Sequence, residues 1–476
     1  MTDLRDDKVT GGTAEVLQMA WPAGLTMLNS VLMRFVDGLM VSRVGPAAFS
    51  AQLVAGMLAF VPESFATGVL TVVNTYVSQN LGARQLHRCG RYAWAGLLLA
   101  AAFALMAAPL AAVARPLFTL IGHGPELSGL ETTYFRYMLA AIFPCLTARV
   151  IQQFFFGIHR PRVVLVASLI ANLFNVAANY VLIFGKLGLP ALGLEGAAIG
   201  TLMSWCLLMG IMASVFFSRD IHRSFATRSR RSVGWRQCRD LLKVGYPPGL
   251  QFANDVLSWS IFVSVLVGAF GRIHLTACTA AMRWMPLSFM PAVGIGIATT
   301  ALVGRYIGEG SPDVARRRAH LALRLALAYM GLCAAAFWLF RRPMVAIFVK
   351  IDPSAGLTSA QAAEQAAEIV RIGGWIMICA AVFQLFDAMA IVYIGALRGA
   401  GDTFWPMVAT IVLSWLVIVG GGYAMVCFLP HLKSIGPWIA AATYVILLGV
   451  LMAWRFESGA WRRIDLLGRA AEGRNP

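Results

Sequence analysis

The sequence predicts an all-α, polytopic membrane protein whose 12 transmembrane helices form two pseudo-symmetric six-helix lobes. Three observations support this prediction. Apolar residues make up 59% of the 476 residues and charged residues only 13%. Apolar runs of spanning length recur along the whole chain, and the second half repeats features of the first. A soluble globular chain carries about a quarter charged residues, so this composition excludes an ordinary soluble enzyme. The composition also excludes a disordered chain, which would need low hydrophobicity and high charge.

The spans are predicted from the length of the apolar runs, because a helix needs about 20 such residues to cross the hydrocarbon core. Helices are required there because lipid offers no partner for backbone groups. Ser311 followed by Pro312 is typical of a helix start, and Gly401 marks a break before the eleventh span. The expected spans are at about 16–42, 48–80, 90–115, 130–156, 162–185, 194–218, 243–268, 274–305, 318–340, 366–396, 405–428 and 435–455.

The two halves of the chain are related by a constant offset in residue number, which indicates a duplication. Each half then holds six spans, and an even number gives both halves the same orientation about an axis along the membrane normal. The same offset separates Pro22 from Pro248, Gly45 from Gly271, Gly68 from Gly294, Val77 from Val303 and Gly82 from Gly308. The predicted domains are an N-lobe at 1–218, a basic cytoplasmic linker at 219–242, a C-lobe at 243–456 and a cytoplasmic tail at 457–476.

Basic residues are concentrated on one side of the predicted membrane. The chain has 39 Lys and Arg against 22 Asp and Glu, a net charge of +17. Most of these cations lie in segments on the same side as the two termini, the linker included. The positive-inside rule therefore predicts cytoplasmic termini in a plasma membrane, the inner membrane of a bacterium. Short basic loops of this kind suit anionic lipid headgroups, and we expect no nucleic-acid partner.

Four acidic residues fall inside predicted spans: Asp37, Glu63, Asp255 and Asp387. An ionisable group at mid-bilayer costs about 2.5–3.5 kcal/mol on insertion scales, so each needs a reason. Asp255 and Asp387 have no basic residue three or four positions away. Removal from water favours the neutral carboxyl, so proton uptake is favoured there over a plain hydrogen bond between helices. Glu63 follows Pro62, and its alternative role is to satisfy backbone groups that the proline frees.

The first span holds Arg34 three residues before Asp37, which allows two interpretations. Either the two side chains form an ion pair that neutralises both, or the carboxylate of Asp37 binds a proton or Na⁺. In the fifth span Asn172, Asn175 and Asn179 form one stripe. Such a stripe either joins helices or supplies amide oxygens for a hard cation beside Asp37. The spacing alone leaves both alternatives open.

Several motifs resemble the multidrug and toxic compound extrusion (MATE) family, and its bacterial NorM-type branch in particular. The most specific is Gly-Ala-Leu-Arg-Gly-Ala-Gly-Asp-Thr at 395–403, preceded by Phe-Gln at 383–384. Val-Asp-Gly-Leu-Met-Val at 36–41 resembles the family's first span. Gly-Leu-Glu-Gly-Ala-Ala at 193–198 resembles its connection between spans five and six. The similarity covers nearly all twelve spans.

The resemblance implies multidrug efflux by alternating access, in which amphipathic, often cationic drugs or toxic organic compounds leave in exchange for H⁺ or Na⁺. It implies a secondary active antiporter without enzymatic activity, acting as a monomer among membrane lipids. No cofactor is expected, apart from possible Na⁺ as coupling ion, and no other metal. Matched by position, the cation or proton-coupling residues are Asp37, Asn175, Asn179, Thr201, Asp255 and Asp387. The expected substrate-cavity residues are Glu63, Arg283 and Arg34.

Two of these positions depart from the family pattern. Asn179 stands where many relatives have Asp, so the N-lobe site has one fewer negative charge, and Asp255 stands where NorM-type members often have Glu. The alternative function is a lipid-linked oligosaccharide or other flippase of the same superfamily. Such a flippase predicts a more cationic cavity for phosphate groups, to which Arg34 and Arg283 would contribute. A major-facilitator transporter would need a Gly-x-x-x-Asp-Arg-x-Gly-Arg-Arg loop, which residues 82–88 do not supply.

Overall fold

A computed structural model describes residues 11–120, 122–228, 234–349 and 358–468. Twelve of its helical segments are long and apolar enough to cross a membrane, which confirms the predicted fold class. The N-lobe spans are α1 (Gly12–Ser42), α2 (Pro46–Leu70) with α3 (Val72–Gly82), α4 (Leu86–Ala107), α6 (Pro125–Gly157), α7 (Pro161–Phe184) and α8 (Gly193–Phe216). The C-lobe spans are α10 (Trp235–Ile261), α11 (Arg272–Met282) with α12 (Met285–Gly308), α13 (Pro312–Leu339), α15 (Ser359–Ala400), α16 (Phe404–Leu413) with α17 (Gly422–Phe428), and α18 (Ile435–Glu457).

Helix boundaries follow the local signals in the sequence. Helix α13 begins at Pro312, with Ser311 as its N-cap residue. Helix α15 ends before Gly401, which takes a left-handed conformation at φ 91° and stops the helix. Gly45 and Gly271 also have positive φ, and they directly precede α2 and α11. These two glycines are related by the offset of the duplication, which therefore extends to the glycine that precedes the helix.

Three short helices and two π-helical segments were absent from the prediction. The short helices are α5 (Ala114–Leu120), α9 (Arg219–Phe225) and α14 (Arg341–Ala346). Helix α9 lies within the segment predicted as a linker, and α10 already begins at Trp235. The π-helical segments are Phe262–Val267, after α10, and Ser414–Gly421, between α16 and α17. Residues 229–233 of the predicted linker and 469–476 of the predicted tail lie outside the described residues.

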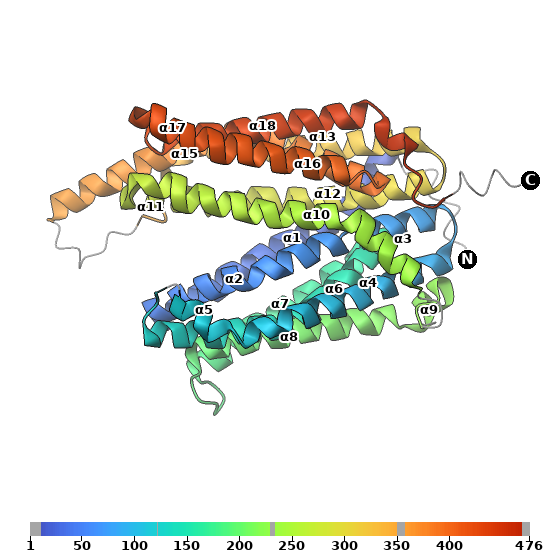
Figure 1. Cartoon of the computed structure of the whole chain (residues 1–476), viewed down its shortest axis with the longest axis horizontal. Coiled ribbons are helices and arrows are strands. Elements are labelled where there is room, and N and C mark those ends of the chain that lie inside the picture. Colours follow the sequence, from blue (N-terminus) through green and yellow to red (C-terminus); the bar gives the residue numbers. More distant parts are fainter. Residues whose placement is uncertain (1–10, 121, 229–233, 350–357, 469–476) are drawn as a thin grey trace, which may run out of the picture.

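Each lobe has its own hydrophobic core, and the first helix of each lobe crosses to the other. One core consists mainly of N-lobe residues and a second of C-lobe residues. A third joins Val16, Met19 and Ala20 at the start of α1 to α12, α13 and α15. In the same way α10 packs along α2. In Figure 1 the two groups of helices converge toward the end where α3 and α9 lie and diverge toward α5 and α11.

The contact between the lobes repeats itself with the offset of the duplication. A Cβ atom at Gly82 would lie 1.9 Å from the carbonyl oxygen of Arg305, and one at Gly308 would lie 2.1 Å from that of Gln79. Gln79 and Arg305 are themselves related by the same offset as Gly82 and Gly308. The lobes therefore meet in two equivalent contacts that only glycine permits.

Hydrogen bonds between the lobes also occur at the end of the molecule where α3 lies. The Thr75 hydroxyl donates to the carbonyl of Arg398 at 2.9 Å, and the Gln79 amide donates to that of Gly399 at 2.9 Å. The start of α1 lies at this end too, because Glu15 contacts Arg318 near the start of α13. We call this region, defined by Glu15, Gln79, Arg305, Arg318 and Gly399, the terminal end.

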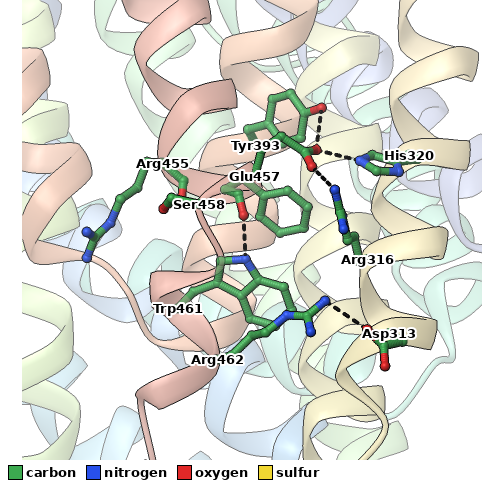
Figure 2. A network of polar contacts seen from close by, with 10 residues as sticks. Asp313, Arg316, His320, Tyr393, Arg455, Glu457, Ser458, Trp461 and Arg462 are labelled. Atoms are coloured by element: carbon green, nitrogen blue, oxygen red, sulfur yellow. Dashed lines mark hydrogen bonds and ion pairs between the residues drawn. The ribbon is translucent and has the colours of Figure 1, made fainter.

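A polar network holds the C-lobe helices together at the terminal end (Figure 2). The carboxylate of Glu457, the last residue of α18, pairs with Arg316 of α13 and lies 2.6 Å from Nε2 of His320. Tyr393 of α15 donates to the same carboxylate at 3.4 Å. Three helices of the C-lobe thus share one carboxylate, which favours their movement as one body.

Candidate functional site

The structure brings Asp37 of α1 together with two of the stripe asparagines of α7. Nδ2 of Asn179 donates to Oδ1 of Asp37 at 2.7 Å and to Oδ1 of Asn175 at 3.2 Å. Asp37 is 8% exposed and both asparagines are fully buried. Asn172, the third member, donates to the backbone carbonyl of Asn29 at 3.1 Å and so joins α7 to α1. The stripe therefore combines helix packing with contact to an acid.

The oxygen atoms around Asp37 are of the kind that a hard cation prefers. Besides the carboxylate, they include Oδ1 of Asn175 and Oδ1 of Asn179. The latter is buried and has no hydrogen-bond partner among the described residues. Thr201, the fourth predicted member, donates to the Ala197 carbonyl within α8 at 2.9 Å. This donor set is chemically suited to Na⁺, although it carries a single negative charge.

Gly200 of α8 positions this site, and no sequence pattern singles it out. A Cβ atom there would lie 2.0 Å from Oδ1 of Asn179. Any larger residue would displace the amide that holds Asp37. Close packing by small residues is common between membrane helices. The sequence cannot reveal such a contact between two helices, because the spacing of residues along one helix does not show which residues of another helix it meets.

A second charged group in the N-lobe involves Glu63 of α2 and Arg149 of α6. Oε1 of Glu63 lies 3.6 Å from Nη2 of Arg149 and accepts a hydrogen bond from Sγ of Cys145 at 3.2 Å. Arg34 interacts electrostatically with Arg149 and Glu63. We call Arg34, Glu63, Cys145 and Arg149 the N-lobe ion cluster. Arg34 therefore belongs to this cluster, whereas Asp37 is bound by Asn179.

In the C-lobe the structure brings Asp255 of α10 and Asp387 of α15 within electrostatic range of each other. Tyr444 of α18 interacts with both carboxylates, and Arg398 interacts with Asp255. Both acids are half-buried. Neither carboxylate has a hydrogen-bond partner in the part of the chain that the structure describes. Two carboxylates with unused hydrogen-bonding capacity are available to a proton or a cation.

The helix that carries Asp255 is fixed by polar side chains that the sequence reasoning missed. Gln251 donates to the Thr410 hydroxyl at 3.0 Å, and Asn254 donates to the Ser414 hydroxyl at 2.9 Å. Ser414 is the first residue of the π-helical segment after α16. Such segments are frequent at functional sites. Here Ser414 of the π-helical segment is hydrogen-bonded to Asn254, the residue next to Asp255.

Arg283, the remaining predicted cavity residue, does not join the N-lobe ion cluster. It follows α11 in the C-lobe, is exposed, and stacks on Phe348 with 5.2 Å between its guanidinium carbon and the ring centroid. Within the described ranges, no group of three or more His, Cys, Asp or Glu residues could hold a metal ion. Apart from Arg283 and Thr201, the predicted site residues thus fall into three groups: around Asp37, around Glu63 and around Asp255.

Comparison with known proteins places the chain among membrane transporters. A family profile described as MatE matches residues 22–181 and 255–423, one segment in each lobe. The chain is 28% identical over 446 residues to the multidrug resistance protein NorM of Burkholderia vietnamiensis, covering 93% of each chain. It is also 28% identical over 461 residues to a probable multidrug resistance protein NorM of Pseudomonas putida, covering 96% of each.

Solved structures share the fold over nearly the whole chain. A MATE protein crystallised in complex with MaD3S superposes with a TM-score of 0.84 at 19% identity, covering 95% of this chain and 97% of that one. A multidrug resistance MATE family transporter of the MOP superfamily, in an outward-facing conformation, gives a TM-score of 0.84 at 21% identity with the same coverage. The arrangement of twelve helices in two lobes is therefore shared with these proteins.

Proposed function

Because this chain belongs to the MatE family, we propose that it is a multidrug efflux transporter that exchanges amphipathic, often cationic organic compounds for H⁺ or Na⁺. The curated relatives described above are multidrug resistance proteins. The observation that carries the proposal is the environment of Asp37. This carboxylate lies within a membrane span, is 8% exposed, and is bound by the neutral amide of Asn179.

A carboxylate in such a place couples cargo to a driving ion. H⁺, Na⁺ or a cationic substrate can each neutralise it, and they compete because the group carries one charge. The empty, charged site resists crossing between states, since an unpaired charge in a medium of low dielectric is costly. The lobes therefore change state when the site is filled, and one occupant leaves as another binds.

Both ions remain candidates for the coupling role. Na⁺ is supported by the oxygens of Asp37, Asn175 and Asn179, which suit a hard cation. H⁺ is supported by Asp255 and Asp387 in the C-lobe, whose carboxylates interact electrostatically and have no hydrogen-bond partner among the described residues. A proton can neutralise one of two carboxylates that repel each other.

The transport cycle requires the terminal end to open and close. We place this end in the cytoplasm, because the basic segments lie there and the positive-inside rule applies. The protein works as a monomer in a plasma membrane, with each lobe moving as one body. In the present structure Gln79, Arg305 and Gly399 lie in the contact between the lobes, so the path toward the cytoplasm is closed.

Transport by the full chain in proteoliposomes tests the proposal. The cationic dye rhodamine 123 is the substrate, and a pH gradient, a sodium gradient or neither is imposed. We expect gradient-driven dye movement with at least one of the two ions and none in empty liposomes. Dye that moves equally with and without a gradient would contradict antiport. Movement of a labelled anionic lipid without any movement of dye would favour the flippase alternative.

A further inference from the structure

A cavity lies at the terminal end, beside the first turns of α13. Its volume is about 460 Å³, and it is lined by Asp313, Arg316, Arg317 and His320. These residues are spaced three or four apart and so share one face of the helix. The side chains of Arg316 and His320 are 44% and 36% exposed. The cavity is therefore open to its surroundings, and three of its four lining residues are basic.

Ion pairs leave a positive charge at this cavity. The carboxylate of Glu457 pairs with Arg316 (Figure 2). The carboxylate of Asp313 pairs with Arg462, with 2.8 Å between Oδ1 and Nη2. Arg317 is exposed, and it has no ion pair or hydrogen bond in the part of the chain that the structure describes. Each acid is thus matched by another arginine, and the charge of Arg317 remains.

A second arginine without a partner follows on the same face of α13. Arg324 comes seven residues after Arg317 and four after His320, is exposed, and likewise has no ion pair among the described residues. At 1.5 Å per residue it lies about 10 Å farther along the helix than Arg317. Arg324 is within a membrane span, where a charge is costly unless it reaches the headgroups or an anion. A long side chain can extend toward the headgroups.

Beyond Arg324 the exposed surface of α13 becomes apolar. Leu332 and Leu339 follow at spacings of eight and seven residues, and they are 74% and 63% exposed. A different face of the helix, which includes Ala322 and Met330, is buried in the core that α13 shares with its neighbours. The exposed face therefore offers cations at the terminal end and apolar side chains along the rest, which is the distribution that a lipid with an anionic headgroup matches.

We propose that Arg317 and Arg324, with His320 between them, bind the phosphate of an anionic lipid, whose acyl chains lie along the exposed face of α13. A guanidinium binds phosphate through two parallel hydrogen bonds. Basic pockets at the cytoplasmic ends of membrane spans bind lipid headgroups of this kind. The inference does not depend on the proposed export function, because lipid binding requires no transport.

The alternative role for these arginines is to fix the orientation of the chain in the membrane. That role depends on how many Lys and Arg residues lie on one side, whereas a binding site depends on where they lie. Arg84 and Arg223 are exposed at the same end in the N-lobe segments after α3 and in α9 (Figure 1), and neither has an ion pair among the described residues. The variant R84Q/R223Q is therefore the matched control for R317Q/R324Q.

Native mass spectrometry of the full chain in detergent tests the proposal. The two probes are palmitoyl-oleoyl phosphatidylglycerol, which is anionic, and the phosphatidylcholine with the same acyl chains, which is neutral overall. We expect the wild type to bind phosphatidylglycerol at least about tenfold more tightly. Each arginine near the membrane surface contributes about fivefold in affinity, so R317Q/R324Q should bind this lipid about 25-fold more weakly. Binding of phosphatidylcholine should not change, and R84Q/R223Q should stay within about twofold of the wild type.

Thermal unfolding provides a second measurement and shows that the variants are folded. Without lipid, R317Q/R324Q should unfold at the temperature of the wild type. Phosphatidylglycerol should raise this temperature for the wild type, because it binds the folded state, and should raise it less for the variant. If the double variant does not fold, R317Q and R324Q are measured singly, with about fivefold weaker binding expected in each.

Three results would overturn the inference. The first is equal affinity of the wild type for the two lipids. The second is an equal loss of phosphatidylglycerol binding in R317Q/R324Q and in R84Q/R223Q, which would assign the effect to overall charge. The third is displacement of the lipid by inorganic phosphate at the concentration of the lipid itself, which would assign the cavity to a soluble phosphate compound.

Discussion

Glu15, near the start of the N-lobe helix α1, forms an ion pair with Arg318 of the C-lobe helix α13, with 2.6 Å between Oε2 and Nε. Tyr306 of α12 donates to the same carboxylate at 2.8 Å. Asp240, near the start of α10, accepts a hydrogen bond from Tyr92 of α4 at 3.1 Å. Tyr92 and Arg318 occupy equivalent positions in the two halves, because the offset of the duplication relates them. Each lobe is thus tied to the other through an acid near the start of its first helix.

Replacement of Glu15 by Gln should destabilise the closed terminal end. The side chains of Glu15 and Arg318 are only 17% and 18% exposed, and a hydrogen bond between charged groups at such a site contributes about 1–2 kcal/mol. The fraction of molecules open at this end should therefore rise about 5- to 30-fold. Hydrogen exchange by mass spectrometry would report this as faster exchange in segments 72–82 and 299–308.

Glu309→Gln is the matched control for Glu15→Gln. Glu309 pairs with Arg305 at 3.0 Å on the same helix, so its loss breaks no contact between the lobes. Exchange in the two segments should then stay near that of the wild type. The idea of an ionic connection between lobes fails if both variants increase exchange equally.

Replacement of Gly308 by Ala should prevent the terminal end from closing fully. The added Cβ atom would lie 2.1 Å from the carbonyl oxygen of Gln79, and a backbone oxygen cannot move aside as a side chain can. We expect a population shifted toward the state open at this end and transport reduced at least tenfold. Gly210→Ala is the control, since a Cβ atom there meets no atom within 4 Å. Wild-type transport by Gly308→Ala would show that closure needs no such contact.

The sequence was sufficient for the spans and for the duplication because both depend on local pattern. Apolar length fixes a span, and Gly45 and Gly271 occupy equivalent positions directly before α2 and α11. The neighbours Asn175 and Asn179 on one face of α7 followed from helical periodicity. That Asn179 reaches Asp37 was one of two open alternatives, and only the packing of α7 on α1 decided it.

The partners of the other charges could not be read from the sequence. Arg34 stands one turn before Asp37, which made an ion pair between them a natural alternative. In the folded chain Arg34 interacts instead with Glu63 and Arg149, which come from α2 and α6. Spacing arguments detect neighbours on one helix, whereas these contacts depend on how three helices are rotated about their axes. Arg283 was grouped with Arg34 by charge alone, and it stacks on Phe348 in the other lobe.

Asp37→Asn and Asp387→Asn should each abolish ion-driven efflux while the protein still inserts and folds. Asparagine keeps the size of the side chain but carries no charge, so neither a driving ion nor a cationic substrate gains from binding there. We expect dye transport under a pH or sodium gradient to fall to the level of empty liposomes. Asp313→Asn is the control, because its side chain is 76% exposed. Wild-type efflux by either variant would remove that residue from the coupling site.

His159, in the loop between α6 and α7, lies at the contact between the lobes. Its Nε2 is 3.3 Å from the carbonyl oxygen of Ala301 on α12. Burial, together with the positive charge of Arg305, lowers the pKa of His159 to about 3. The imidazole is therefore neutral in the closed state at any physiological pH. In a state open at the terminal end it would meet water and regain an ordinary pKa of about 6.5.

Acid should therefore favour opening of the terminal end. Between about pH 6.5 and pH 3 the open form of His159 binds a proton that the closed form does not, so the closed state loses stability as the pH falls. From pH 7.5 to 5.5 the ratio of open to closed molecules should rise about tenfold. Distances between spin labels at the exposed residues His87 and Arg317 would measure this ratio, with the exposed Cys206 and Cys427 replaced by Ser. His159→Gln should remove most of the pH dependence, and an unchanged pH profile in that variant would assign the effect to another group.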